Sequence, residues 1–214
     1  QELGDGIGGL LPLKSGDILL DGKSIKDLSV KERIDAGVGY VHADRLTAGL
    51  VLEMSVSENM FLKNSFDPAW AKNIFINRKK LNGYADKAIE DYSIKASGND
   101  ELVKGLSGGN QQKVVVAREV DVGRKAIIFD QPTRGLDLGA IDYVHKTILA
   151  ERDKGKCVLL ISTELSEIFA LADRIGVLYS GRLLRIINRE HADIETIGML
   201  MAGYEPEEGN PDES

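Results

Sequence analysis

Residues 126–161 read AIIFDQPTRGLDLGAIDYVHKTILAERDKGKCVLLI, and this stretch decides the fold class. It opens with a short apolar run that stops at Asp130 and closes with a second apolar run over residues 157–161. Between the runs, apolar residues recur on one face of a predicted helix over residues 138–154, which Gly155 ends. Two strands that are apolar on both faces and joined by a helix are typical of a βαβ unit in a buried parallel sheet. We therefore expect an α/β fold.

The patterns on either side of this stretch extend the same fold. The dipeptide Asp21-Gly22 predicts a β-hairpin over residues 17–25, because both central positions of a two-residue type I′ turn need a positive φ angle. Residues 46–120 become more polar and helical, which predicts an inserted helical subdomain. Residues 1–11 are expected to form the end of a helix, although each interior glycine costs a helix about 1 kcal/mol relative to alanine. The remaining predictions are strands over 38–41, 175–179 and 183–187, and helices over 77–92, 107–120 and 165–172.

Composition narrows the class further. The chain has 214 residues, a hydrophobic fraction of 43% and 23 glycines, against 6% aromatic residues. This mix can bury a core and favours an α/β architecture with many turns over a β-sandwich. The net charge is −7, and residues 204–214 carry five acidic residues and no Lys or Arg, so we expect an acidic disordered tail. No basic stripe is present, and a nucleic acid is therefore not expected as a partner.

The sequence also bears on location. No apolar run reaches the roughly 20 residues that a membrane span needs, and no signal peptide is recognisable. The single cysteine, Cys157, lies in an apolar run and is expected to be a small buried core residue. Lack of a disulfide predicts a reducing compartment. We therefore expect a soluble, cytoplasmic chain.

The strongest functional pattern is LSGGNQQK over residues 106–113. Ser107 is predicted to be the N-cap of the following helix, and two glycines would let a phosphate approach the N–H groups at the helix start. From these residues alone, an ordinary capped helix is the alternative. With its flanking residues, the segment resembles the signature motif of ABC ATPases, in a variant similar to that of sugar and nucleoside importers. The resemblance implies that five residues bind nucleotide: Ser107, Gly108, Gly109, Asn110 and Gln111.

Residues 127–137, IIFDQPTRGLD, resemble a Walker B strand that runs into a D-loop. Asp130 stands at the end of a predicted buried parallel strand, where open α/β sheets bind their ligands. Its expected role is to hold the Mg²⁺ of the nucleotide, through water. Asp137 joins the implied nucleotide-binding residues. The alternative is a strand capped by a turn. Residues 40–45 and 49–51 are similar to the stretch after the Q-loop of this family.

The resemblance covers about residues 1–203 and implies a P-loop NTPase-like ABC cassette, the second or C-terminal nucleotide-binding domain of a ribose, galactose or nucleoside importer. Residues 1–45 would hold a partial β part and the Q-loop region, residues 46–120 the helical subdomain that ends in the signature helix, and residues 121–203 the Walker B, D-loop and switch core. The implied cofactors are ATP and Mg²⁺ in the full-length assembly. The implied partners are the N-terminal cassette of the same protein, membrane permease subunits and, indirectly, a solute-binding protein. The implied location is cytoplasmic, peripheral on the inner face of the cell membrane.

The phosphate-binding pattern G-x-x-x-x-G-K-[ST] is absent from the sequence. A near miss, in which five residues separate Gly16 from Gly22-Lys23-Ser24, has the wrong spacing and lies in the predicted hairpin. Gln1-Glu2-Leu3 resembles the helix that follows the phosphate loop in this family. Our interpretation is that the first strand and the phosphate loop are missing.

Three positions depart from the family's catalytic residues, so none is intact and the chain alone is predicted to be inactive. Gln131 stands where competent cassettes carry Glu, and an amide cannot take a proton from water. Thr163 stands at the switch-histidine position, and Ala43 lies at or beside the Q-loop position. We expect this domain to supply its signature motif to the partner cassette. The alternatives are a catalytically inactive regulatory or dimerisation module, and an ABC ATPase acting on DNA or ribosomes, which the lack of heptads and basic runs disfavours.

Two further predictions concern exposure. His42 is expected to be a partly exposed loop residue. Four apolar residues of the helical subdomain could either form an exposed contact for a permease or be buried in the core of the subdomain, and we expect most of them to be buried. This group consists of Met54, Met60, Phe61 and Leu62.

Overall fold

The computed structural model describes residues 1–65, 70–72 and 75–204. The chain divides into two compact units, Gln1–Ile161 and Ser162–Ser214. The predicted segment boundaries at residues 45 and 120 stay an interpretation of the sequence. The predicted acidic tail lies outside the described residues, except for residue 204.

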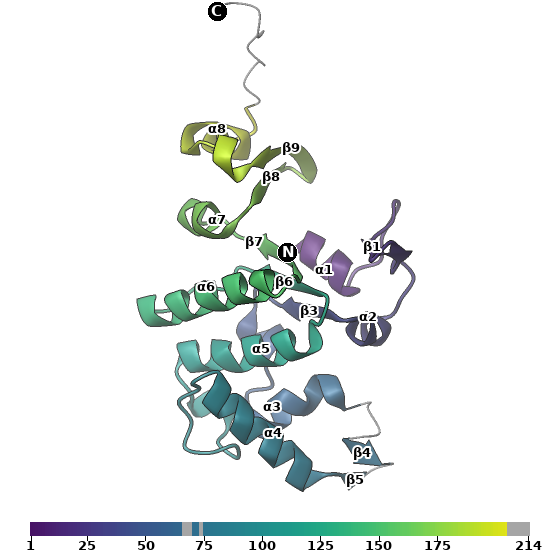
Figure 1. Cartoon of the computed structure of the whole chain (residues 1–214), viewed down its shortest axis with the longest axis vertical. Helices are drawn as coiled ribbons and strands as arrows, with labels where there is room; N and C mark the ends of the chain where they lie inside the picture. The colour runs from purple at the N-terminus through teal and green to yellow at the C-terminus, as the bar shows by residue number, and fades with distance from the viewer. Residues whose placement is uncertain (66–69, 73–74, 205–214) are drawn as a thin grey trace, which may run out of the picture. The chain divides into compact units, whose positions relative to one another are not determined.

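A parallel sheet forms the centre of the first unit (Figure 1). Its strands are β3 (Val38–Val41), β6 (Ala126–Asp130) and β7 (Cys157–Ile161), in the order β3-β6-β7. The helix α6 (Leu138–Asp153) connects β6 to β7, and Asp130 pairs with Ile161 in the parallel register. The βαβ unit predicted from the apolar runs is confirmed.

The helix α5 (Gly108–Val122), most of whose residues are buried, packs directly on β3. The backbones approach so closely that a Cβ atom at Gly39 would collide with the carbonyl oxygen of Glu119. Glycine is the only residue that permits this approach without a shift. The position of α5 against the sheet is therefore set at Gly39.

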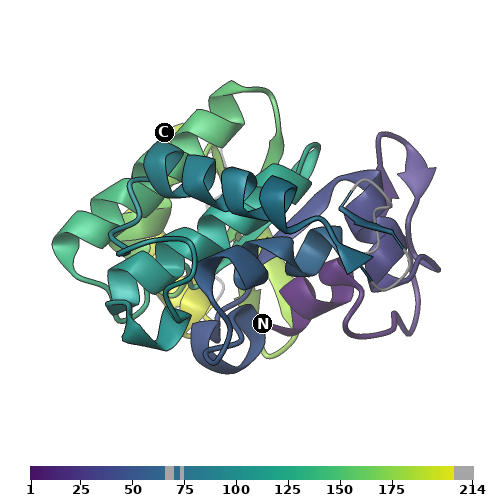
Figure 2. The same ribbon diagram turned by 90° about the horizontal axis from the view of Figure 1, so that it is seen from below.

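The predicted helical segment lies on the other side of α5, as Figure 1 shows. Figure 2 shows α3 and α4 side by side. Met60 and Phe61 are buried, whereas Met54 and Leu62 are partly buried, so the expectation of core is confirmed for the first two. The elements of this segment are α3 (Val56–Phe61), η2 (Leu62–Asn64), β4 (Ala71–Lys72), β5 (Phe75–Ile76), α4 (Arg78–Asp91) and η3 (Val103–Gly105).

The hairpin predicted over residues 17–25 is confirmed, because β1 (Leu19–Leu20) and β2 (Lys23–Ser24) pair there antiparallel. Asp21 and Gly22 have φ angles of 51° and 73°, as a turn with two left-handed residues requires. The helix predicted over residues 1–11 is shorter and ends at Gly8, with Gly9 in the left-handed conformation of a helix C-cap. The elements here are α1 (Glu2–Gly8), β1 (Leu19–Leu20), β2 (Lys23–Ser24), α2 (Val30–Ala36) and the π-helical turn η1 (Arg45–Gly49).

The second unit contains a helix, a hairpin and a final helix. The two strands predicted over residues 175–179 and 183–187 are confirmed and pair as an antiparallel hairpin, which turns at Ser180 and Gly181, both with positive φ angles. Its core includes Ile175 and Val177 from the hairpin and Ile197 from the last helix. Its elements are α7 (Leu165–Leu171), β8 (Arg174–Tyr179), β9 (Arg182–Asn188), η4 (Arg189–His191) and α8 (Ile194–Met201).

The prediction that Cys157 is a buried core residue is wrong, because the structure leaves it exposed. Cys157 is the first residue of β7, and β7 pairs with β6 on one side only. An apolar run at the margin of a sheet does not need to be covered along its whole length. Among the described residues, no helix combines the length and apolar character needed to cross a membrane.

Candidate functional site

The start of α5 presents an exposed turn. Ser107 occupies the N-cap position with extended backbone, but its side chain makes no bond to the helix N–H groups. Its Oγ accepts a hydrogen bond of 2.9 Å from Nδ2 of Asn110 instead. The predicted position of the cap is right and the predicted side-chain cap is wrong. The first N–H groups of α5 therefore keep no side-chain partner from Ser107, and such groups attract anions.

The side chains of two other predicted nucleotide-binding residues, Asn110 and Gln111, make hydrogen bonds within the protein. Oδ1 of Asn110 accepts a hydrogen bond of 2.8 Å from the backbone N–H of Lys95. Gln111 is buried and donates from Nε2 to the carbonyl oxygen of Val103 at 3.2 Å. Both side chains therefore already make hydrogen bonds within the protein. Their assignment as nucleotide-binding residues stays a prediction.

The structure brings Asp137 to the same turn. A Cβ atom at Gly109 would lie 3.4 Å from Oδ2 of Asp137 and 3.0 Å from Cβ of Ala140. Asp137 is the N-cap of α6, and its Oδ1 accepts from the N–H of Ala140 at 2.9 Å. Gln112 adds a direct tie between α5 and the loop after β6, through a 2.7 Å hydrogen bond to the carbonyl oxygen of Pro132. The two motifs found in the sequence therefore meet in space.

Arg45 is a residue of this site that sequence reasoning missed. Its Nη2 lies 3.1 Å from the position that a Cβ atom of Gly108 would take. Its Nε is buried and has no hydrogen-bond partner among the described residues. Burial lowers the pKa of Arg45, and the nearby Asp44 carboxylate opposes that shift. The sequence shows only an arginine after a strand, which carries no signal by itself.

Asp130 ends β6 and is almost completely buried. Its Oδ2 accepts from the hydroxyl of Tyr40 at 3.3 Å, while its Oδ1 has no hydrogen-bond partner in the described part of the chain. The same hydroxyl donates to Oδ1 of Asp5 at 2.9 Å. The backbone nitrogen of Gln1 lies 3.7 Å from Oδ2 of Asp130, which places the start of α1 at this carboxylate. Asp5 and Tyr40 were not singled out as site residues from the sequence.

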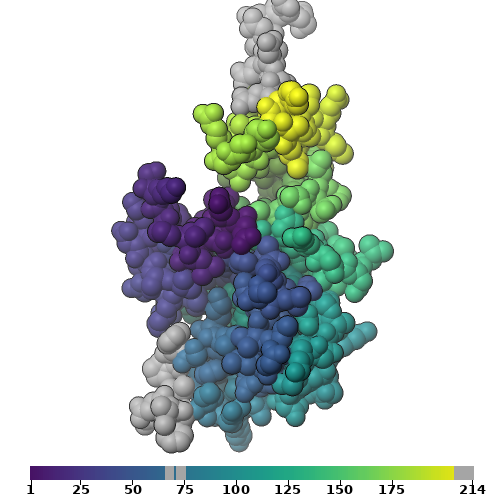
Figure 3. Space-filling model, turned by 180° about the vertical axis from the view of Figure 1, so that it is seen from behind, coloured from purple at the N-terminus to yellow at the C-terminus, as the bar shows by residue number. Residues whose placement is uncertain are grey.

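His42 follows β3 beside this cluster. Its Nδ1 accepts from the backbone N–H of Asp44 at 2.9 Å, so the ring proton lies on Nε2, which is 3.4 Å from Oδ1 of Asp5. His42 is partly exposed, as predicted. Figure 3 shows the N-terminal residues in purple next to the blue residues that follow β3. Ala43 lies between His42 and Asp44 and offers no polar side chain.

The residue after Asp130 has an unusual backbone. Gln131 has a φ angle of 48°, in the left-handed region that non-glycine residues rarely adopt, and its N–H donates to the carbonyl oxygen of Ile161 at 2.8 Å. Thr163 is exposed and belongs to the second unit. Within the described ranges, no group of three or more His, Cys, Asp or Glu side chains is placed to hold a metal ion. A metal at Asp130 would therefore need water or a ligand's oxygens.

Comparison with known proteins gives a consistent result. The family described as "ABC transporter" matches residues 5–134. The nucleoside import ATP-binding protein NupA of Lactococcus lactis subsp. cremoris (strain MG1363) is 41% identical over 202 residues, which are 94% of this chain and 40% of that protein. The guanosine import ATP-binding protein NupO of Bacillus subtilis (strain 168) is 37% identical over 203 residues, with 95% and 40% covered.

A third relative, the ribose import ATP-binding protein RbsA of Bacillus licheniformis, is 36% identical over 205 residues, with 94% of this chain and 41% of that protein covered. The chain thus spans about two fifths of the length of the curated relatives it matches. Among solved structures, the dimeric ATP-binding cassette MJ0796 bound to ADP and Pi aligns with a TM-score of 0.72 at 22% identity, covering 88% of this chain and 79% of that chain. This likeness shows that the fold is that of an ATP-binding cassette.

Proposed function

The chain belongs to the ABC transporter family, and we propose that it is a nucleotide-binding domain of a sugar or nucleoside importer, in the C-terminal position of a protein with two cassettes. The printed names of the relatives concern nucleoside, guanosine and ribose import, which supports this choice of solute class. The observation that carries the proposal is the exposed start of α5 at Ser107, which its own side chain does not cap.

This turn has the electrostatics that a triphosphate needs. The N–H groups at the start of α5 carry a partial positive charge, and the guanidinium of Arg45 lies beside Gly108. The carboxylate of Asp137 is also close, but it caps the start of α6, whose own partial positive charge offsets it. We infer that the turn binds the phosphates of a nucleotide held by the partner cassette.

ATP and Mg²⁺ are the proposed cofactors. Asp130 suits Mg²⁺, because its buried Oδ1 has no hydrogen-bond partner and Mg²⁺ is commonly bound through one or two carboxylates plus waters and phosphate oxygens. When bound, Mg²⁺ neutralises charge on the phosphates. In this chain Asp130 would hold the ion, and Tyr40 occupies the other oxygen of that carboxylate.

Hydrolysis at this domain's own site is proposed to be weak or absent. The amide of Gln131 cannot accept a proton from water, and Thr163 offers no positive charge to a γ-phosphate. An activating role toward the N-terminal cassette fits these residues better than an independent catalytic role. The further proposed partners are permease subunits of the membrane and, through them, a solute-binding protein. The proposed location is the cytoplasmic face of the cell membrane.

The substitution Ser107→Arg in the full-length protein tests this proposal. A long cationic side chain at the helix start would block the phosphates, and we expect the ATPase rate to fall about a hundredfold, as when one hydrogen-bond donor of an oxyanion hole is lost. Ser15→Arg, at an exposed serine between α1 and β1, is the control for added charge. An unchanged rate in Ser107→Arg would refute the role of this turn.

A catalytically inactive regulatory or dimerisation module is the second candidate. Gln131 supports it, since this residue replaces the base that hydrolysis needs. The two candidates differ in nucleotide contact. If Ser107→Arg changes assembly of the two cassettes but leaves ATP affinity and turnover at wild-type values, the regulatory module is the better description.

A further inference from the structure

Tyr40 lies in a groove that α1 makes for it. A Cβ atom at Gly4 would lie 2.7 Å from the Tyr40 hydroxyl oxygen, and one at Gly8 would lie 2.8 Å from its Cδ1. Both glycines lie on one face of α1, because residues four apart in a helix are neighbours. At Gly6, by contrast, a Cβ atom would meet no atom of the described residues within 4 Å. Because Gly4 and Gly8 have no side chains, the ring of Tyr40 can pack directly against α1.

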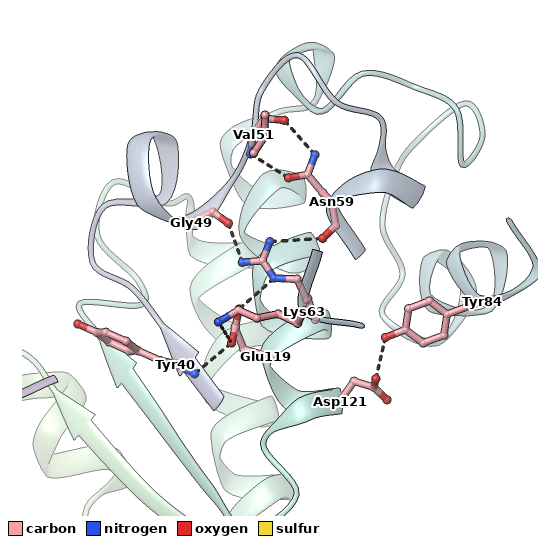
Figure 4. A network of polar contacts seen from close by, with 9 residues as sticks. Tyr40, Gly49, Val51, Asn59, Lys63, Tyr84, Glu119 and Asp121 are labelled. Atoms are coloured by element: carbon pink, nitrogen blue, oxygen red, sulfur yellow. Dashed lines mark hydrogen bonds and ion pairs between the residues drawn. The ribbon is translucent and has the colours of Figure 1, made fainter. Parts of the chain in front are cut away.

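The backbone of Tyr40 is held from the opposite direction. Its N–H donates to Oε2 of Glu119 at 3.1 Å, and Glu119 has no exposed surface. The carboxylate of Glu119 also accepts from Nε of Arg118 at 2.9 Å and lies 3.5 Å from Nζ of Lys63. Figure 4 shows these contacts converging on Glu119. A buried charge with three donors is costly to move, so the backbone at Tyr40 has a fixed position.

The same network reaches into the helical segment. Arg118 donates to the carbonyl oxygen of Gly49 at 2.7 Å and to that of Asn59 at 3.4 Å. The side-chain amide of Asn59 in turn bonds both the N–H and the carbonyl oxygen of Val51, at 2.9 and 3.0 Å (Figure 4). Tyr40 is thus tied to α5, to the turn after β3 and to α3 by hydrogen bonds.

At the tip of the side chain, one hydroxyl hydrogen faces two carboxylates. Tyr40 donates to Asp5 at 2.9 Å and to Oδ2 of Asp130 at 3.3 Å. Burial, followed by the hydrogen bond to Asp5, raises the pKa of Tyr40 well above its usual value, so the hydroxyl keeps its hydrogen. Within residues 1–65, 70–72 and 75–204, Oδ1 of Asp130 is left without a hydrogen-bond partner.

We propose that Tyr40 is a positioning residue for Asp130, which holds Oδ2 of the carboxylate and leaves Oδ1 as the atom that binds the metal of the nucleotide. The inference rests on the proposed function, since it needs a divalent cation at Asp130. Residues that orient a metal ligand without touching the metal commonly change metal affinity by tenfold or more when they are replaced.

Binding of Mn²⁺ in the presence of ATP, followed by electron paramagnetic resonance on the full-length protein, tests the proposal. Asp130→Asn first defines the part of the Mn²⁺ binding that depends on Asp130. In Tyr40→Phe we expect that part to weaken about tenfold. Tyr84→Phe is the matched control, because it removes a hydroxyl that donates to another carboxylate, Asp121, at 2.9 Å.

Gly8→Ala gives an independent test if Tyr40→Phe does not fold. The added methyl group would displace the ring of Tyr40, and we expect weaker Mn²⁺ binding, whereas Gly6→Ala should leave it unchanged. Wild-type Mn²⁺ affinity in Tyr40→Phe, or in Gly8→Ala where that variant decides, overturns the positioning role alone. An equal loss in the control variants also overturns it. If Asp130→Asn removes no Mn²⁺ binding, the proposed metal role of Asp130 fails and the inference fails with it.

Discussion

The side chain of Arg45 extends from η1 to Gly108 at the start of α5, and its position there lowers the stability of the free protein. A buried N–H without a hydrogen-bond partner costs about 1–3 kcal/mol, and Nε of Arg45 is such a group. Gln131, with its left-handed backbone, is a second unfavourable residue next to the candidate metal ligand. Unfavourable local features of this kind concentrate at functional sites.

Replacement of Arg45 should therefore stabilise the fold. In Arg45→Met we expect the free energy of unfolding to rise by about 1 kcal/mol, because the desolvated Nε is removed while the apolar stem is kept. Chemical denaturation at neutral pH measures this change. Lys63→Met should shift stability the other way, since Lys63 lies 3.5 Å from the buried carboxylate of Glu119. A loss of stability in Arg45→Met would contradict the expectation.

At the scale of elements, α1 is a helix whose sequence has low helix propensity but whose glycines allow a close contact with Tyr40. Its glycines weaken the helix, yet two of them make the groove for Tyr40 and the third faces open space. Hydrogen bonds from Arg33 to the carbonyl oxygens of Gly6 and Ile7, at 2.7 and 2.8 Å, hold the end of this helix. The stability of α1 thus depends on tertiary contacts more than on its own propensity.

Alanine substitutions in α1 should separate these two effects. Gly6→Ala is expected to raise the free energy of unfolding by about 1 kcal/mol, the difference in helix propensity between the two residues. Gly4→Ala should lower it, because the new Cβ would lie 2.7 Å from the hydroxyl oxygen of Tyr40. Thermal unfolding of the two variants measures both changes. If the two substitutions shift the free energy of unfolding equally and in the same direction, the groove for Tyr40 is contradicted.

Over the whole molecule, hydrogen-bonded carboxylates are spread along the chain. A hydrogen bond is the largest cause of a lowered pKa at three of them. The donor is the Ser24 hydroxyl for Asp17, the Ser29 hydroxyl for Glu32 and the Ser97 backbone N–H for Glu101. For Glu151, burial would raise the pKa, but the hydrogen bond from Lys154, the ion pair with Lys156 and the positive charges of both lysines together lower it. Because these groups bind protons more weakly when folded, acid favours the unfolded chain.

Stability should accordingly be highest above the ordinary carboxyl pKa values of 3.8 and 4.5 and fall as the pH drops through and below them. Unfolding by denaturant at a series of pH values from about 6 to 3 follows this loss. In Glu151→Gln the acid dependence should become shallower, because one of the lowered groups is gone. A stability that stays level through this range would argue against the carboxylate contacts described for the folded chain.

The sequence by itself determined the α/β class, the βαβ unit and the two motifs, because apolar periodicity and turn residues act over short distances along the chain. It also placed Asp130 at the end of its strand. Only the tertiary structure decided that Asp137 and Arg45 meet the glycines at Ser107, and that Tyr40 shares its hydroxyl between Asp5 and Asp130. It likewise exposed Cys157, which the apolar run had suggested was buried. These outcomes depend on which elements pack together, and that is set by contacts between residues far apart in the chain.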